Sequence, residues 1–136
     1  MTFTFDPAGR AVFLDVWITG PSDTKLARLR LDTGATHTLI RATMLELVGF
    51  RPADMTRPRR FRSATGGGEA PTLVLRQLLA LGHTRTEFRV AAYDPPPAVS
   101  GDGLLGLDFL RGRVLTLDFA RGRVGLRAPR NWWPWG

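Results

Sequence analysis

Residues 31–36, Leu-Asp-Thr-Gly-Ala-Thr, contain the side chains of this chain best suited to chemistry. Asp32 ends an apolar segment and is followed by a hydroxyl, a glycine and a small residue. In a tight loop of this composition, backbone amides and the Thr33 hydroxyl can fix a carboxylate. Two such carboxylates that share a proton can activate water. The motif occurs once, so we predict that the second carboxylate comes from another copy of the chain.

Other nucleophiles and metal ligands are sparse. The chain has no cysteine, which excludes disulfides, a cysteine nucleophile and thiolate zinc sites. Its histidines, His37 and His83, are far apart in sequence. We therefore expect no metal site, and the sequence implies no organic cofactor.

The segment that positions Asp32 alternates as a half-buried strand does. In residues 26–32, Leu29 and Leu31 share one face, and Arg28, Arg30 and Asp32 share the other. This periodicity places Arg30 on the same side as the candidate catalytic carboxylate.

Most other segments also have strand character, with turn residues between them. Strands are predicted over residues 11–20, 38–40, 59–64, 71–81, 85–93, 113–119 and 123–127. Short helices are predicted over 42–48 and 106–111, and the prolines after Asp94 end the preceding strand. Many short strands indicate a mostly β sandwich or barrel.

A glycine-rich stretch, Thr65-Gly66-Gly67-Gly68-Glu69, separates two of these strands. Ordering three consecutive glycines costs much backbone entropy. We predict a mobile hairpin tip over residues 65–68, and no lysine follows to make it a phosphate-binding loop.

Length and charge limit the function classes. The 136 residues fit one domain, 1–136, with a core of about 11–127 and an aromatic tail, 128–136. The net charge is +7, with Lys25 the only lysine among 19 basic residues, and the arginines are spread along the chain. No nucleic-acid recognition motif accompanies them, so no nucleic-acid partner is expected. No apolar run is long enough to span a membrane, so a membrane partner is not expected. No signal peptide is evident, so a cytoplasmic location is expected.

Three features now occur in a meaningful order: Asp32-Thr33-Gly34-Ala35, the glycine-rich hairpin, and Gly103-Leu104-Leu105-Gly106-Leu107-Asp108. In this the chain resembles the retropepsin-like aspartic proteases, especially the small bacterial single-domain members, over roughly residues 11–127. The resemblance implies a closed β-barrel or sandwich with one or two short helices and a flap hairpin. It also implies a homodimer that hydrolyses peptide or protein substrates.

The resemblance assigns roles to the matching positions. Asp32 would be catalytic, Thr33 would brace the loops across the dimer, and Gly34 would give its amide to the carboxylates. Substrate would lie against Ala35 and Leu104, beneath a flap tip formed by residues Thr65, Gly66, Gly67 and Gly68.

The chain departs from the viral members of the family at three positions. Thr36 and Leu107 stand where viral members have an acidic residue and its arginine partner, so both charges are absent together. Arg30 stands where leucine is common. It either lines a substrate pocket for an acidic side chain or points to solvent.

Two further matters stay open at this stage. The same loop would serve a module that binds a peptide or a partner without cutting it. The tail, Asn131-Trp132-Trp133-Pro134-Trp135-Gly136, could pack on its own domain or the partner subunit, meet a membrane interface or reach the cleft.

Three other acids are not in an Asp-Thr-Gly setting, and we interpret them as structural: Asp102, Asp108 and Asp118.

Overall fold

The computed structural model describes residues 1–54, 58–63, 66–96 and 98–130, with the backbone only for 58–63 and 66–69. The strands are β1 (Phe3–Thr4), β2 (Phe13–Thr19), β3 (Thr24–Leu31), β4 (Leu39–Arg41), β5 (Pro58–Ser63), β6 (Gly66–Ala80), β7 (His83–Tyr93), β8 (Gly103–Leu105), β9 (Val114–Asp118) and β10 (Arg123–Arg127). The helices are α1 (Ala42–Leu47), a 3-10 turn η1 (Pro52–Asp54), and α2 (Leu107–Leu110). None of the helices in the described ranges has the length and apolar character needed to cross a membrane.

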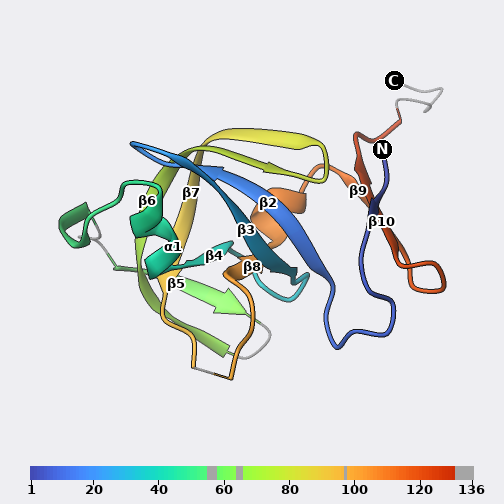
Figure 1. Cartoon of the computed structure of the whole chain (residues 1–136), viewed down its shortest axis with the longest axis horizontal. Coiled ribbons are helices and arrows are strands. Elements are labelled where there is room, and N and C mark those ends of the chain that lie inside the picture. Colours follow the sequence, from blue (N-terminus) through green and yellow to red (C-terminus); the bar gives the residue numbers. More distant parts are fainter. Residues whose placement is uncertain (55–57, 64–65, 97, 131–136) are drawn as a thin grey trace.

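Six strands form a closed barrel, as the mostly β composition predicted (Figure 1). Their order is β2-β3-β8-β4-β7-β6, and β6 pairs back onto β2 through Ile18 and Leu78. β5 adds to the outer end of β6. Closure leaves few free edges, which protects a small β protein from pairing with other chains.

The barrel interior is filled by alternating apolar side chains. In β2 the residues Leu14, Val16 and Ile18 are buried while their neighbours face outward, and Leu29 does the same from β3. Phe109 of α2 enters this core and is fully buried. Burying each such side chain contributes about 1.5–3 kcal/mol. This packing fixes which face of β3 points outward.

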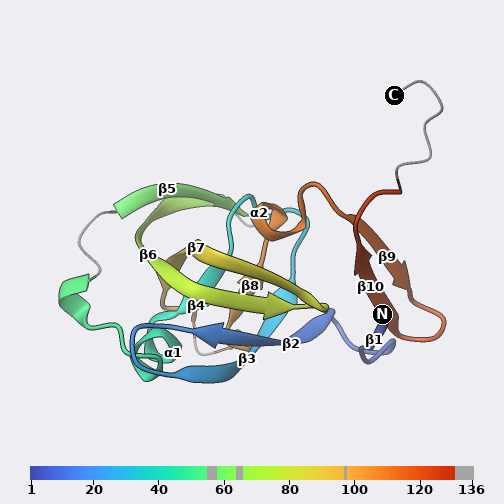
Figure 2. The ribbon, with the colours of Figure 1, turned by 90° about the horizontal axis from the view of Figure 1, so that it is seen from above.

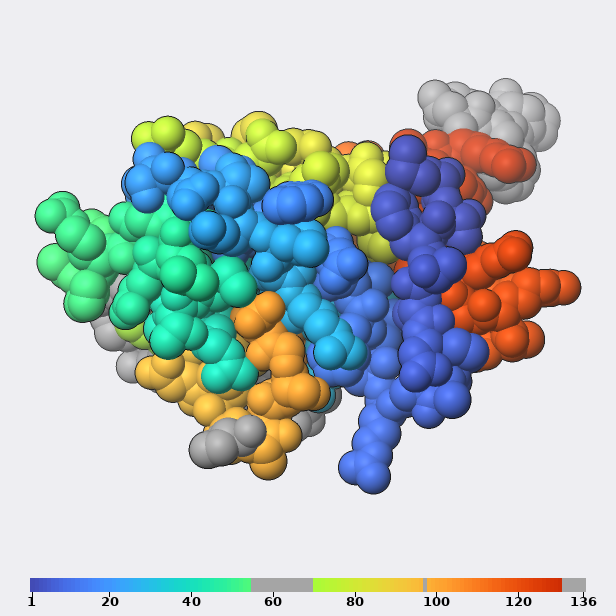
Figure 3. Space-filling view, in the orientation of Figure 1, coloured from blue at the N-terminus to red at the C-terminus, as the bar shows by residue number. Residues whose placement is uncertain are grey.

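The N-terminal strand β1 and the hairpin of residues 114–127 form a second sheet with the order β1-β10-β9 (Figure 2). The predicted C-terminal hairpin is confirmed as β9–β10, and Val124 and Leu126 extend the main core into it. In the space-filling view the first residues, in dark blue, lie against this hairpin, in red (Figure 3). The sheet lies at one end of the barrel (Figure 2).

The prediction for the glycine-rich stretch was wrong in part. Gly66, Gly67 and Gly68 belong to β6 and pair in register with Ser63, Arg62 and Phe61 of β5. Backbone hydrogen bonds of a ladder need no side chain, so glycine can take part in them although it is entropically costly. The strands therefore reach almost to the tip, and Thr65 lies outside the described residues.

The predicted helices are confirmed at slightly shorter lengths. α1 ends at Leu47, and α2 spans only Leu107–Leu110. Two strands were not predicted, β1 and β8, because two or three residues are too few to show a periodicity. β8 is central to the site, since it lies between β3 and β4.

Candidate active site

The Asp32 loop leaves the end of β3 and is held by its own backbone. The Asp32 amide donates to the Leu105 carbonyl oxygen at 3.0 Å, which continues the β3–β8 pairing by one residue. The Gly34 amide donates to Asp32 Oδ1 at 2.9 Å. These bonds fix both the backbone and one carboxylate oxygen, so the half-buried Asp32 side chain has a defined orientation.

The next residues divide between surface and interior. Thr33 and Gly34 are exposed, whereas Ala35 is fully buried. The Ala35 amide donates to the Asp32 carbonyl at 3.2 Å, which closes the turn. The loop therefore presents Asp32, Thr33 and Gly34 outward on a base anchored at Ala35.

The segment from β8 into α2 packs directly behind this loop. The Leu107 amide donates to the Ala35 carbonyl at 2.8 Å, and the Asp108 amide to the Thr36 carbonyl at 3.2 Å. A side chain at Gly106 would place its Cβ 2.8 Å from the His37 carbonyl and 2.9 Å from the Ala35 carbonyl oxygen. Only glycine permits this close approach, which explains its position in the sequence.

A buried polar network joins the two segments, and sequence reasoning missed it. The Thr38 side chain is fully buried, and its hydroxyl donates to Asp108 Oδ1 at 2.7 Å. The same hydroxyl accepts from the Gly106 amide at 3.1 Å, and the Thr38 amide donates to Asp108 Oδ2 at 2.9 Å. Asp108 also accepts from the Phe109 amide at 2.9 Å, at the start of α2. An acid directly at a predicted helix start was the only sequence signal for it.

A small apolar cluster lies on the outer face of the sheet beside Asp32. Its members come from the Asp32 loop and from β4, β6, β7 and β8: Ala35, Leu39, Ala70, Ala91 and Leu104. Because Ala70 belongs to it, the base of the β5–β6 hairpin packs onto the same face as the loop. Tyr93 packs against the cluster at its edge.

The structure thus brings most of the predicted site residues together. Leu104 pairs with Arg30 in the β3–β8 ladder, two residues before Asp32. Ala35 and Leu104 belong to one cluster, but both are largely buried in the single chain. Gly66, Gly67 and Gly68 lie on the hairpin that begins at this cluster, and Thr65 lies outside the described residues.

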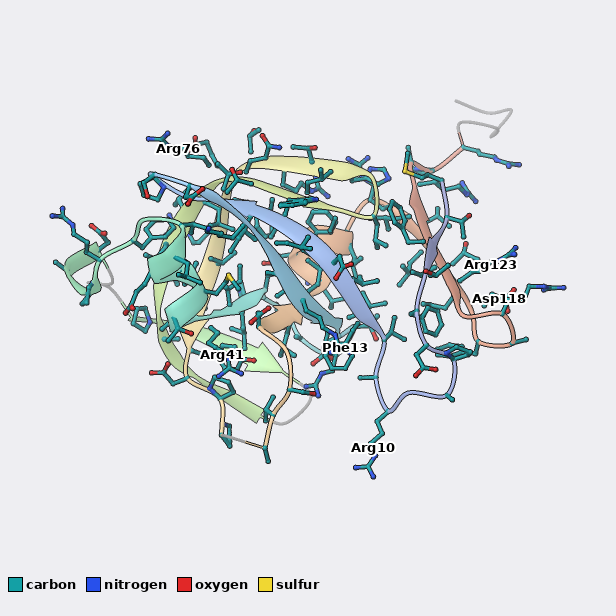
Figure 4. The ribbon with its side chains drawn as sticks, in the orientation of Figure 1. Arg10, Phe13, Arg41, Arg76, Asp118 and Arg123 are labelled. Atoms are coloured by element: carbon teal, nitrogen blue, oxygen red, sulfur yellow. The ribbon has the colours of Figure 1, made fainter. Side chains whose placement is uncertain are left out.

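The three other candidate acids hold structural positions, in agreement with their interpretation. Asp108 serves the network above, and Asp102 Oδ2 accepts from the Arg28 amide at 2.8 Å. Asp118 ends β9, far to one side in Figure 4, where hydrogen bonds from the Arg121 backbone and side chain lower its pKa. None of these three carboxylates hydrogen-bonds with Asp32.

Comparisons with known proteins agree with this geometry. The model of the family described as "Aspartyl protease" matches residues 14–109. A crystal structure of a retropepsin-like aspartic protease from Rickettsia conorii has a TM-score of 0.69 and 16% sequence identity, over 94% of this chain and 89% of that chain. At this identity the likeness establishes the fold, and the predicted retropepsin-like barrel is confirmed. A search of curated proteins finds no match.

Proposed function

The chain belongs to the aspartyl protease family, and we propose that it hydrolyses peptide bonds with two Asp32 carboxylates, one from each subunit of a homodimer. Two carboxylates about 3 Å apart cannot both ionise easily, so the pair holds one proton. The ionised member takes a proton from water as the water attacks the scissile carbonyl. The protonated member donates a hydrogen bond to the carbonyl oxygen.

One observation carries this proposal: a single carboxylate is oriented by its own loop and presented to the outside. Gly34 holds Asp32 Oδ1, and the neighbouring Thr33 and Gly34 are exposed. The other candidate acids Asp102 and Asp108 already accept backbone amides. A second acid for Asp32 is therefore best supplied by a symmetric copy, in which the same loop faces its counterpart.

The remaining residues receive roles in the same proposal. Thr33 braces the two loops across the two-fold axis. The face formed by Ala35 and Leu104 supports the substrate backbone, and the β5–β6 hairpin closes over an extended peptide. Closure would exclude water and add backbone hydrogen bonds.

Cleavage of unstructured peptides tests this function. A synthetic library of unstructured decapeptides is incubated with the protein between pH 4 and 7, and products are identified by mass spectrometry. We expect internal cleavage with a bell-shaped pH dependence, because the pair works with one proton and loses activity with none or two. Asp32→Asn serves as the inactive control. Peptide binding without cleavage at every pH would instead identify a non-catalytic module.

A further inference from the structure

Arg30 lies on the substrate side of the sheet. Leu29 and Leu31 pack into the barrel core, so Arg30 projects to the opposite face of β3. Leu104 and the rest of the small apolar cluster beside Asp32 lie on that face. Successive residues on one face of a strand are about 6.6 Å apart. Arg30 is therefore one such step from Asp32. Side chains of an extended peptide have the same spacing, so a residue adjacent to the cleaved bond comes opposite Arg30.

The guanidinium of Arg30 has no partner among the side chains that the structure describes, although the residue is half-buried. Its neighbours on this face are engaged. Arg28 stacks on the Phe13 ring at 4.0 Å, and Arg41 donates to the Gly101 carbonyl at 2.8 Å. Arg30 is thus the cation of this group that is available to a ligand.

Tyr93 and Arg41 form a second wall of the same region. They are cross-strand neighbours on β7 and β4, and Tyr93 packs on the cluster that contains Leu104. Burial raises the pKa of Tyr93, and the charges of Arg41 and Arg30 partly oppose this rise. Both guanidinium groups therefore lie near the phenol, which stays protonated at neutral pH and can donate a hydrogen bond.

Around Arg30 this face carries charges of both signs. The described cations are Arg28, Arg30 and Arg41. The acids beside them are Asp102, which accepts the Arg28 amide, and Asp15, which is the cross-strand partner of Arg28. Asp32 lies beyond them and shares its proton in the proposed dimer. A carboxylate entering beside Leu104 would meet attraction from the arginines and an apolar floor that excludes water.

We propose that Arg30 forms a pocket for an acidic side chain, so that the protease prefers substrates with glutamate or aspartate next to the cleaved bond. The inference rests on the proposed function. Arginine suits this role because its planar guanidinium binds a carboxylate through two parallel hydrogen bonds. Leucine at this position would offer only apolar contact.

Matched peptides test the pocket. From a cleaved library peptide, versions are made with Glu, Gln, Leu or Lys at each position around the cut, and kcat/KM is measured for each. At one position we expect kcat/KM of the Glu peptide to exceed that of the Gln peptide by about 10- to 100-fold, which is the range of a charge-assisted hydrogen bond. Arg30→Leu should reduce this ratio to near one, and Arg30→Glu should favour Lys. Arg76→Leu, an exposed arginine on the far side of the barrel from Arg41 in Figure 4, should keep the wild-type ratio.

The outcomes separate the two proposals. If wild type cleaves, Asp32→Asn does not, and the Glu/Gln ratio is the same in wild type, Arg30→Leu and Arg30→Gln, the acidic pocket is overturned while the protease stands. If wild type cleaves nothing, binding of the Glu and Gln peptides is compared by fluorescence polarisation. A preference for Glu that disappears in Arg30→Leu supports the pocket, and equal binding overturns it.

Discussion

Asparagine in place of Asp32 is expected to lower kcat/KM for peptide hydrolysis by about 10³-fold or more. The amide cannot take a proton from water, although its oxygen can still accept the Gly34 amide as Asp32 Oδ1 does. The loop should therefore keep its shape while the chemistry is lost. The measurement is kcat/KM on one peptide cleaved by the wild type, with circular dichroism to confirm the fold.

The same substitution should strengthen the dimer. Two neighbouring carboxylates repel unless they hold a proton, and two amides do not. Sedimentation at pH 7 should show tighter association of Asp32→Asn than of wild type. The matched control is Asp15→Asn, an outward-facing aspartate of β2, which should change neither activity nor association. A fully active Asp32→Asn protein would refute the assignment.

Alanine in place of Asp108 is expected to destabilise the fold by about 3–5 kcal/mol, a large part of the stability of a typical domain. The change removes the acceptor of the Thr38 hydroxyl, the Thr38 amide and the Phe109 amide. Because Thr38 is fully buried and Asp108 half-buried, water replaces the lost acceptor only in part. Urea unfolding followed by tryptophan fluorescence measures the loss.

Asp118→Ala provides the comparison for this effect. Asp118 also accepts a backbone amide and a side-chain donor, but both come from Arg121 in an exposed turn. Its removal should leave the unfolding midpoint unchanged. Equal effects of the two substitutions would show that the Thr38–Asp108 network does not hold the Asp32 loop.

The strands that carry the fold could be predicted because one face of each is buried. The alternation of residues 26–32 placed Leu29 inside and Arg30 outside, and the structure agrees. β8 could not be found in this way, since its three residues are all buried. The prediction of a hairpin tip over the glycine-rich stretch was wrong in part because glycine content indicates an entropic cost of ordering. It does not show that β5 pairs with these residues.

The candidate site residues that lie in a short sequence motif could be predicted. Those whose role depends on contacts between distant segments could not. Asp32, Gly34 and Gly106 lie in short motifs that resemble those of the retropepsin-like family. Thr38 and Asp108 are 70 residues apart, and no spacing rule joins them. Their role depends on β8 and α2 returning behind the Asp32 loop, which is a property of the barrel topology.

Mixing wild-type protein with Asp32→Asn tests the central claim most directly. If each active unit needs Asp32 from two subunits, random exchange at equal concentrations leaves about half of the wild-type rate, and a tenfold excess of variant leaves about a tenth. Native mass spectrometry confirms that mixed dimers have formed. An unchanged rate at every ratio, with subunit exchange complete, would contradict the shared pair and assign catalysis to one chain.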